Sequence, residues 1–248
     1  MRQNIYDDET FFTGYRALRD TADNFNNLVE QPALRALLPP LGGKVVLDLG
    51  CGFGDLAAYC VAQGAARVTA TDISTRMLAQ ARERNALPQI EYVKSAMEDL
   101  DFPPASVDLV VSSLALHYVA DYAGLVRKVA GWLTAGGDFV FSVEHPICTA
   151  QKADQTWLRD EAGRKLCWPV DDYSDEGRRE FGWYVPGVIK YHRTVSTLLN
   201  GLMEAGLAVA GVQEPVASEE TIRRLPEYAA TRRVPPFLLV KSNKPEGN

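Results

Sequence analysis

The sequence predicts an α/β fold in which helices cover both faces of a largely parallel sheet. Short runs rich in β-branched and aliphatic residues alternate with segments of helical periodicity along most of the 248 residues. Such alternation arises from right-handed β-α-β crossovers, which leave parallel strands buried on both faces. Hydrophobic residues make up 46% of the chain, which is enough for a buried core and too many for a disordered protein. We expect one domain, because α/β domains of about 200–250 residues commonly form a single unit.

The first half of the predicted sheet has the clearest boundaries. Residues 45–49 form an apolar run that ends in glycines, and a helix is expected over 55–63. A second strand covers 67–72, and Ser74 is placed to cap the helix that follows it. Further strands are expected at 90–94, 107–112 and 138–144.

The second half adds two helices, two strands and an insertion. Apolar residues at helical spacing predict a helix over 122–133, and a similar stripe at 195–203 precedes strands at 207–212 and 237–240. The expected insertion, residues 145–192, is rich in aromatic residues and follows the fifth strand, so we expect a lid or a binding wall. Within it, 182–192 has the pattern of a hairpin with Pro186-Gly187 as its turn.

Composition and charge exclude several classes of protein. A net charge of −6 and a pI near 5.2 argue against a nucleic-acid partner, because the phosphate backbone is bound mainly by clustered Lys and Arg. No apolar run reaches the ~18–20 residues that span a bilayer, and the first residues do not resemble a signal peptide. We therefore expect a cytoplasmic protein with no membrane partner. Four cysteines without a Cys-x-x-Cys pair predict reduced thiols and no zinc site.

A glycine-rich turn follows the first predicted strand, at the position where open parallel sheets bind ligands. Residues 48–54 read Asp-Leu-Gly-Cys-Gly-Phe-Gly, and the glycines allow a ligand to approach the backbone closely. A dinucleotide fingerprint, Gly-x-Gly-x-x-Gly, would require glycine at the position of Asp55. A carboxylate there repels a pyrophosphate, so the pattern disfavours NAD.

Acidic residues close the first two strands and suit a cationic nucleoside. Asp48 is placed to accept hydrogen bonds from the amino-acid end of S-adenosyl-L-methionine, and Asp72 is placed to bind both ribose hydroxyls. After the third strand, Ala96 and Met97 offer a small and a soft side chain to flank adenine. The pattern therefore predicts S-adenosyl-L-methionine as the cofactor and S-adenosyl-L-homocysteine as its product.

These residues also carry a family resemblance. The core from about residue 44 to 144 resembles the class I S-adenosylmethionine-dependent methyltransferases, especially their type-11-like small-molecule branch. The matching motifs are residues 46–54, 71–74, 96–99 and 107–119, with 133–137 matching the turn before the fifth strand. The family implies a Rossmann-like seven-stranded sheet of order 3-2-1-4-5-7-6 with strand seven antiparallel. Phe53 departs from the pattern, since Thr or Ser is frequent there and would place a hydroxyl near the cofactor's carboxylate.

The resemblance also divides the single domain and implies the cofactor site. The expected parts are an N-terminal helical cap (1–43), a cofactor-binding core (44–144), a substrate lid (145–192) and a C-terminal segment that completes the sheet (193–248). The residues expected to bind the cofactor are Tyr15, Asp48, Gly50, Cys51, Gly52, Asp72, Ile73, Met77, Ala96, Met97, Glu98 and Ser113.

All three histidines fall near the carboxyl edge of the predicted sheet, where a methyl acceptor would bind. His117 follows the fourth strand, His145 follows the fifth, and His192 ends the insertion. Glu144 adjoins His145 and is placed to orient it as a general base, so His145, His117 and Glu144 are the candidate catalytic residues. Residues 113–116 contain no carboxylate after the fourth strand, so we expect no metal.

The expected acceptor wall combines histidines with aromatic residues of the insertion, beside Phe11 and Tyr15 of the N-terminal segment. Its members are His117, His145, Trp183, Tyr184, Tyr191 and His192. We expect in-line methyl transfer to O, N or C of a small organic molecule by a monomer or homodimer. Positioning of the acceptor can lower the activation barrier by about 7–11 kcal/mol. Whether a general base is also needed depends on whether the acceptor atom must lose a proton. The alternatives are an NAD-dependent oxidoreductase, a non-catalytic cofactor-binding scaffold, and a methyltransferase with a protein acceptor.

Overall fold

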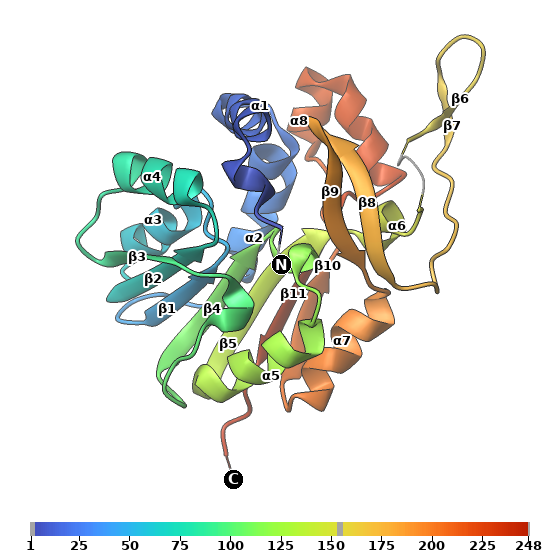
Figure 1. Cartoon of the computed structure of the whole chain (residues 1–248). Helices are drawn as coiled ribbons and strands as arrows, with labels where there is room; N and C mark the ends of the chain where they lie inside the picture. Colours follow the sequence, from blue (N-terminus) through green and yellow to red (C-terminus); the bar gives the residue numbers. More distant parts are fainter. Residues whose placement is uncertain (1–2, 153–155, 248) are drawn as a thin grey trace.

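The computed structural model describes residues 3–152 and 156–247 and confirms the predicted α/β architecture (Figure 1). Strands β1 to β5 pair in parallel, whereas β11 is antiparallel to both β5 and β10. The seven-stranded sheet has the order β3-β2-β1-β4-β5-β11-β10, which is the implied order 3-2-1-4-5-7-6 with β10 and β11 as the last two strands. The strands are β1 (Val45–Leu49), β2 (Arg67–Asp72), β3 (Ile90–Lys94), β4 (Val107–Ser113), β5 (Leu133–Glu144), β10 (Ala208–Gln213) and β11 (Phe237–Asn243).

Strand β5 differs from its predicted bounds. It begins at Leu133 rather than Asp138, because the preceding helix ends at Trp132 and Leu133 is already extended and paired with Val107 of β4. A register shift in β4 after this pair accommodates the longer β5. Leu133 therefore belongs to the sheet, although its spacing fits the helical stripe before it.

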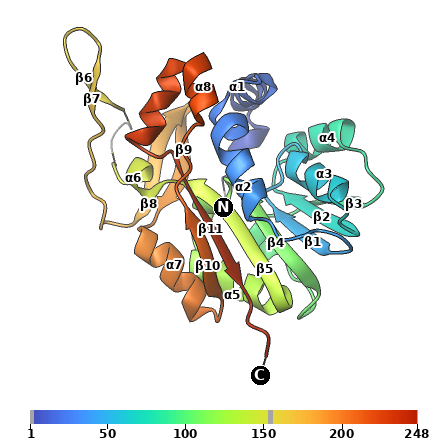
Figure 2. The same ribbon diagram turned by 180° about the vertical axis from the view of Figure 1, so that it is seen from behind.

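Helices cover both faces of the sheet (Figures 1 and 2). The side chains of β1 alternate between two cores: Leu47 and Leu49 pack with the helices on one face, and Val46 packs with those on the other. The first face is covered by α5 (Tyr122–Trp132) and α7 (Val195–Glu204), and the second by α2 (Gln31–Leu37) and α3 (Asp55–Ala62). The other helical elements are α1 (Glu9–Asp20), α4 (Thr75–Arg84), α6 (Pro146–Thr149), α8 (Glu219–Arg224) and the short 3-10 helices η1 (Ile5–Asp7), η3 (Met97–Asp99), η4 (Leu116–Tyr118) and η5 (Pro226–Arg232).

The N-terminal segment contains the expected helices and one element that the sequence did not predict. A π-helical turn, η2 (Asn26–Glu30), leads directly into α2. Its wider winding leaves two consecutive polar residues, Glu30 and Gln31, buried at the end of the sheet. The predicted cap of α4 is confirmed, since the Ser74 side chain accepts a hydrogen bond from the backbone of Met77.

The insertion after β5 consists of α6 and two hairpins. The hairpin of β6 (Leu158–Arg159) and β7 (Lys165–Cys167) projects away from the rest of the molecule, whereas β8 (Gly177–Trp183) and β9 (Val185–His192) form a longer hairpin (Figures 1 and 2). Its turn lies at Tyr184, because Trp183 pairs with Val185, and the prediction of a turn at Pro186-Gly187 was wrong. Tyr184 adopts a φ of 57° that places its ring against α1, where a Cβ on Gly14 would lie 2.5 Å from it.

The architecture brings distant parts of the chain to one edge of the sheet. The parallel strands β1, β2 and β4 end at this edge, and residues 3–8 cross it before α1 begins (Figure 1). Among residues 3–152 and 156–247, no helix has the length and apolar character needed to cross a membrane.

Candidate active site

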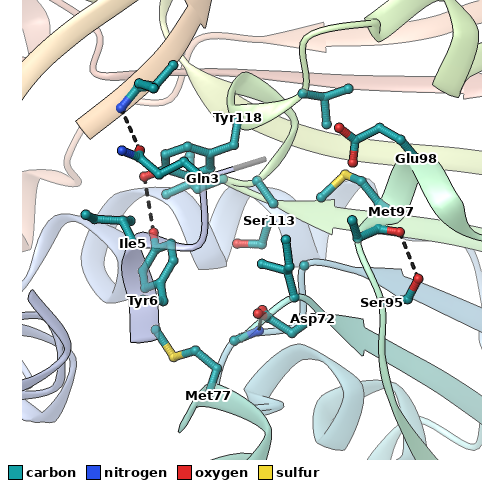
Figure 3. A pocket seen from close by; sticks show the side chains of 18 of the residues that line it. Gln3, Ile5, Tyr6, Asp72, Met77, Ser95, Met97, Glu98, Ser113 and Tyr118 are labelled. Atoms are coloured by element: carbon teal, nitrogen blue, oxygen red, sulfur yellow. Dashed lines mark hydrogen bonds between the residues drawn. The ribbon is translucent and has the colours of Figure 1, made fainter. Parts of the chain in front are cut away.

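A cavity of about 350 Å³ lies at the carboxyl edge of the parallel strands (Figure 3). A smaller cavity of about 50 Å³ adjoins it and shares Tyr15, Gly50, Gly52, Ser113 and Leu114 as lining residues. Ten of the twelve predicted cofactor-binding residues line the larger cavity: Tyr15, Gly50, Gly52, Asp72, Ile73, Met77, Ala96, Met97, Glu98 and Ser113. The other two, Asp48 and Cys51, line the smaller one.

The glycine-rich turn between β1 and α3 forms the floor of both cavities. Gly50 has a φ of 76°, and a Cβ added to it would lie 2.4 Å from the Cβ of Ala115, so no side chain fits there. Gly52 also has a left-handed φ, but the space that a Cβ would occupy is open. Because neither Gly50 nor Gly52 has a side chain, a ligand has room to lie directly against the backbone of the turn.

Asp48 is the buried acid at the end of β1. Both of its carboxylate oxygens are buried, and neither has a hydrogen-bond partner among the described residues. Burial, with a smaller contribution from the nearby carboxylates of Asp72 and Asp55, raises the pKa of Asp48 to about 8. Buried polar groups are nearly always hydrogen-bonded in folded proteins, so an unpaired carboxylate beside a cavity indicates a ligand with a donor or a positive charge.

Asp72, at the end of β2, is held in place by backbone amides. Its two oxygens accept hydrogen bonds from the amides of Gly52 (3.0 Å) and Ser74 (2.8 Å). Burial raises the pKa of Asp72 to about 6, although these two hydrogen bonds act in the opposite direction. Each oxygen retains a further lone pair, so the fixed carboxylate can accept hydrogen bonds from two neighbouring hydroxyls.

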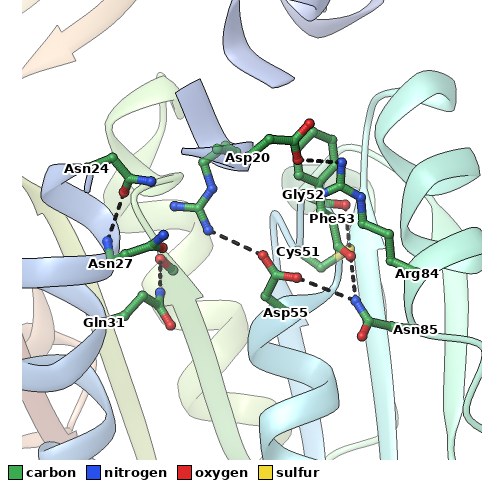
Figure 4. Close-up of polar contacts among 12 residues, drawn as sticks. Asp20, Asn24, Asn27, Gln31, Cys51, Gly52, Phe53, Asp55, Arg84 and Asn85 are labelled. Carbon is green, nitrogen blue, oxygen red and sulfur yellow. Dashed lines mark hydrogen bonds and ion pairs between the residues drawn. The ribbon is translucent and has the colours of Figure 1, made fainter. Parts of the chain in front are cut away.

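Two residues of the smaller cavity were missed by the sequence analysis (Figure 4). Arg19 of α1 donates a hydrogen bond to Asp55 (3.3 Å), and it lines the same smaller cavity as Asp48, to which it adds a positive charge. Gln31 donates to Glu30 (2.8 Å) and to Ser113 (3.1 Å), while its buried Oε1 has no partner among the described residues. Arg19 follows Tyr15 by four residues, so their common helix face was a signal that could have identified it.

The buried Glu30 beside Gln31 holds this end of the site together. Its Oε1 accepts hydrogen bonds from Ser142 (2.5 Å) and Ser113 (2.9 Å), which belong to β5 and β4. Burial raises the pKa of Glu30, and these hydrogen bonds partly offset that effect. No sequence pattern predicted this contact, because it depends on the π-helical turn that precedes α2.

The structure does not bring His145 or His192 to either cavity. His145 caps α6: its Nδ1 accepts a hydrogen bond from Ile147 (3.1 Å), and its Nε2 lies 2.7 Å from Glu214. In His192, Nδ1 is 2.8 Å from the Thr149 hydroxyl and Nε2 is 2.9 Å from a backbone carbonyl. The ring of His145 therefore joins α6 to Glu214, which follows β10, and the ring of His192 joins two parts of the insertion to each other.

Replacing His145 with Ala should change stability rather than turnover. The loss of a helix N-cap costs about 0.5–2 kcal/mol, so we expect the free energy of unfolding to fall by about 1 kcal/mol. The measurements are urea denaturation and the single-turnover rate of cofactor-dependent product formation. A rate reduced by more than about a hundredfold, the lower end of the range for a lost general base, would show that His145 takes part in the chemistry.

Glu144 and His117 line neither cavity. His117 is buried, whereas Glu144 is partly exposed. Glu144 forms an ion pair with Lys190 (2.5 Å) and contacts neither cavity, so it is not oriented toward His145 as expected. Burial would raise the pKa of Glu144, but Lys190 and His117 lower it overall. Burial lowers the pKa of His117 to about 4, and its Nδ1 has no partner among the described residues. Its neighbour Tyr118 does line the cavity, with its hydroxyl 3.2 Å from that of Tyr6.

Of the three predicted aromatic residues of the insertion, Tyr191 lines the larger cavity and the other two support its wall. Trp183 makes edge contacts with Phe11 (centroids 5.2 Å apart) and Tyr15 (5.8 Å), and it stacks on Tyr184 (5.3 Å). The aromatic hairpin therefore packs against α1 and fixes Tyr15 at the cavity.

Comparisons with known proteins agree with this geometry. Residues 47–141 match the family model described as a methyltransferase domain. An uncharacterized protein of Haemophilus influenzae is 31% identical over 98% of both chains. The chain is similar to the crystal structure of a putative S-adenosylmethionine-dependent methyltransferase from Listeria monocytogenes, with 41% sequence identity and a TM-score of 0.83 over 88% of this chain and 97% of that one. It is also similar to the crystal structure of an S-adenosylmethionine-dependent methyltransferase from Mesorhizobium loti, with 44% identity and a TM-score of 0.81 over 86% of this chain and 97% of that one.

Proposed function

Because the chain belongs to the S-adenosylmethionine-dependent methyltransferases, we propose that it transfers a methyl group by in-line displacement to an O, N or C atom of a small organic acceptor. The observation that carries the cofactor side of this proposal is the buried carboxylate of Asp48, whose two oxygens lack protein partners among the described residues. A ligand with an ammonium group supplies the missing donors. When bound, the cofactor supplies a methyl group already activated by a sulfonium.

The residues around the two cavities fit each part of that cofactor. We assign Asp48 and the free Oε1 of Gln31 to its ammonium group and the guanidinium of Arg19 to its carboxylate. Asp72 accepts hydrogen bonds from the ribose hydroxyls, and Ala96 and Met97 flank the adenine. Asp72 and Glu98 are the charged residues of the larger cavity, and both are acidic, which suits a cationic ligand.

The acceptor end of the larger cavity supports a small, uncharged acceptor. It is formed by residues 3–6, by η4 and by β9, and the described lining residues include no Lys, Arg or His. Gln3 and Tyr191 contribute polar side chains there, and the hydroxyls of Tyr6 and Tyr118 lie 3.2 Å apart. Burial raises the pKa of both phenols, so they remain neutral and orient a nucleophile by hydrogen bonding rather than by charge. The insertion contributes Tyr191 here, which supports its assignment as the acceptor lid.

The test is to screen small metabolites for S-adenosylhomocysteine release, and then to compare Tyr118→Phe with the wild-type enzyme. Removing the hydroxyl is expected to lower kcat/KM for the acceptor by about tenfold, because one orienting hydrogen bond of about 1 kcal/mol or more is lost. Affinity for S-adenosylhomocysteine should stay the same. Tyr92→Phe is the matched control, since its hydroxyl bonds to Asn85 outside the cavity. If release occurs only with proteins or nucleic acids, the small-molecule assignment is wrong.

A further inference from the structure

Residues 3–8, here called the N-terminal strap, cross the mouth of the larger cavity. Figure 3 shows Gln3, Ile5 and Tyr6 of the strap facing Tyr118, with the cavity between the strap and the ends of the strands. The strap contains η1 and ends where Asp8 caps α1. It therefore contributes part of the cavity wall, although it belongs to neither the sheet nor the insertion.

One end of the strap is bound to β9. The side-chain amide of Gln3 donates to the carbonyl of Gly187 (2.6 Å) and accepts from the amide of Ile189 (2.8 Å). This pair of hydrogen bonds reproduces the contact that a neighbouring strand would make with the edge of β9. In the middle of the strap, the Tyr6 hydroxyl lies 3.2 Å from that of Tyr118.

The other end of the strap is bound to the N-terminus of α4 through Asp7. Its carboxylate accepts hydrogen bonds from the Ser74 hydroxyl (2.6 Å) and from the amides of Arg76 (3.1 Å) and Thr75 (3.3 Å). Asn4 donates to the same carboxylate (2.7 Å) from within the strap. A carboxylate at the N-terminus of a ten-residue helix bonds free amides and interacts favourably with the helix dipole, so this contact is the firmest that the strap makes.

The contact of Asp7 is shared with the ribose-binding acid. The amide of Ser74 donates to Asp72 (2.8 Å), while the hydroxyl of Ser74 donates to Asp7 and accepts from Met77 (3.1 Å). Ser74 thus joins the strap, the start of α4 and the Asp72 carboxylate in one hydrogen-bonded unit. Release of Asp7 would free the strap and also loosen the loop that positions Asp72.

We propose that Asp7 is a positioning residue of the cofactor site: it fastens the N-terminal strap to α4, so that cofactor entry and release require the strap to open. The strap also supplies Gln3, Ile5 and Tyr6 to the acceptor end of the cavity. Closure over the cofactor therefore completes the acceptor wall, and the acceptor binds after the cofactor. This inference rests on the proposed function only for the acceptor step.

The experiment compares Asp7→Ala with Asp8→Ala in the full chain, with S-adenosylhomocysteine as the probe. Asp8 is the matched control because it is the adjacent carboxylate and also caps a helix, but its helix is α1: its side chain accepts a hydrogen bond from the amide of Phe11 (2.9 Å). Asp7→Ala should raise the dissociation rate constant by about tenfold, as the loss of charge-assisted hydrogen bonds implies, without slowing association. Asp8→Ala should change it by less than about twofold. A merely structural defect would slow association as well.

A second measurement and a second variant keep the test decisive. In the wild-type protein, S-adenosylhomocysteine should slow hydrogen exchange at the amides of Asp7 and Asp8 in the strap, and Asp7→Ala should abolish that protection. If Asp7→Ala does not fold, Gln3→Ala removes the contact with β9 and should also accelerate dissociation. Unchanged dissociation in both variants, or strap exchange that is the same with and without the bound probe, would overturn the inference. Failure of the probe to bind the wild-type protein in calorimetry would instead overturn the assigned cofactor site, so the two failures are distinguishable.

Discussion

The Asp48→Asn variant is expected to bind S-adenosylhomocysteine about a hundredfold more weakly than the wild-type protein and yet to unfold at a higher temperature. The weaker binding follows because a charge-assisted contact, whose hydrogen bonds contribute about 1.5–3 kcal/mol each, is lost from the ammonium group. The higher stability follows because this buried carboxylate has no hydrogen-bond partner within residues 3–152 and 156–247. Calorimetry measures the first effect and thermal unfolding without ligand the second.

The size of the stability effect depends on pH. Burial raises the pKa of Asp48 from 3.8 to about 8, so the folded protein keeps a proton there that the unfolded chain has lost. The wild-type protein therefore loses stability as the pH rises between these values, while Asp48→Asn does not. The difference in melting temperature should be larger at pH 8 than at pH 5. An equal difference at both values would show that Asp48 is not protonated in the free protein.

Asp108→Asn is the matched control for this variant. Asp108 lies on the neighbouring strand β4, but its carboxylate accepts hydrogen bonds from Val45 (2.9 Å) and Thr134 (3.2 Å). Replacing it should lower stability and leave affinity for S-adenosylhomocysteine unchanged. If both variants lose affinity equally, the loss at Asp48 reflects general damage to β1 and β4 rather than a ligand contact.

The Asp72→Ala variant is expected to bind S-adenosylhomocysteine more than about tenfold more weakly, because it loses the acceptor for the ribose hydroxyls. A 2′-deoxy analogue of S-adenosylhomocysteine separates this contact from damage to the loop. The wild-type protein should bind the analogue more weakly than the parent compound, whereas Asp72→Ala should bind the two alike.

Glu91→Ala supplies the matched control for this experiment. Glu91 is an exposed carboxylate on β3, next to β2, and lines neither cavity. Its replacement should preserve the preference for the parent compound over the deoxy analogue. If Asp72→Ala preserves that preference as well, the ribose is bound elsewhere.

The cofactor side of the molecule was predictable from sequence because its geometry is local. Asp48, Gly50 and Gly52 lie within one turn, and Asp72 ends the next strand, so parallel pairing of β1 with β2 is enough to bring them together. The helices and strands follow from hydrophobic periodicity and the cap at Ser74 from residue type, whereas the order of the strands was implied by the family resemblance. Each of the twelve residues predicted for this side lines one of the two cavities.

The acceptor side was not predictable because it depends on contacts between distant segments. Gln3 bonds to Gly187 across almost the whole chain, and neither residue has a local signal for that pairing. His145 lies at the end of β5, as expected, but its ring turns to cap α6 instead of facing the cavity. The turn at Tyr184 likewise depends on packing against Gly14, which overrides the local preference of Pro186-Gly187.

The π-helical turn η2 makes the length of the segment before α2 critical. An ordinary α-helix advances about 100° per residue, and a π-helical turn holds roughly one extra residue. Deleting one residue between Asn26 and Glu30 would restore regular winding and rotate the preceding chain by that angle against α2. If α1 kept its present position, Glu30 and Gln31 would rotate away from the ends of β4 and β5, and Glu30 would lose its hydrogen bonds with Ser113 and Ser142. Relatives that hold residues equivalent to Glu30 and Gln31 in this position should therefore tolerate substitutions in this segment far better than deletions.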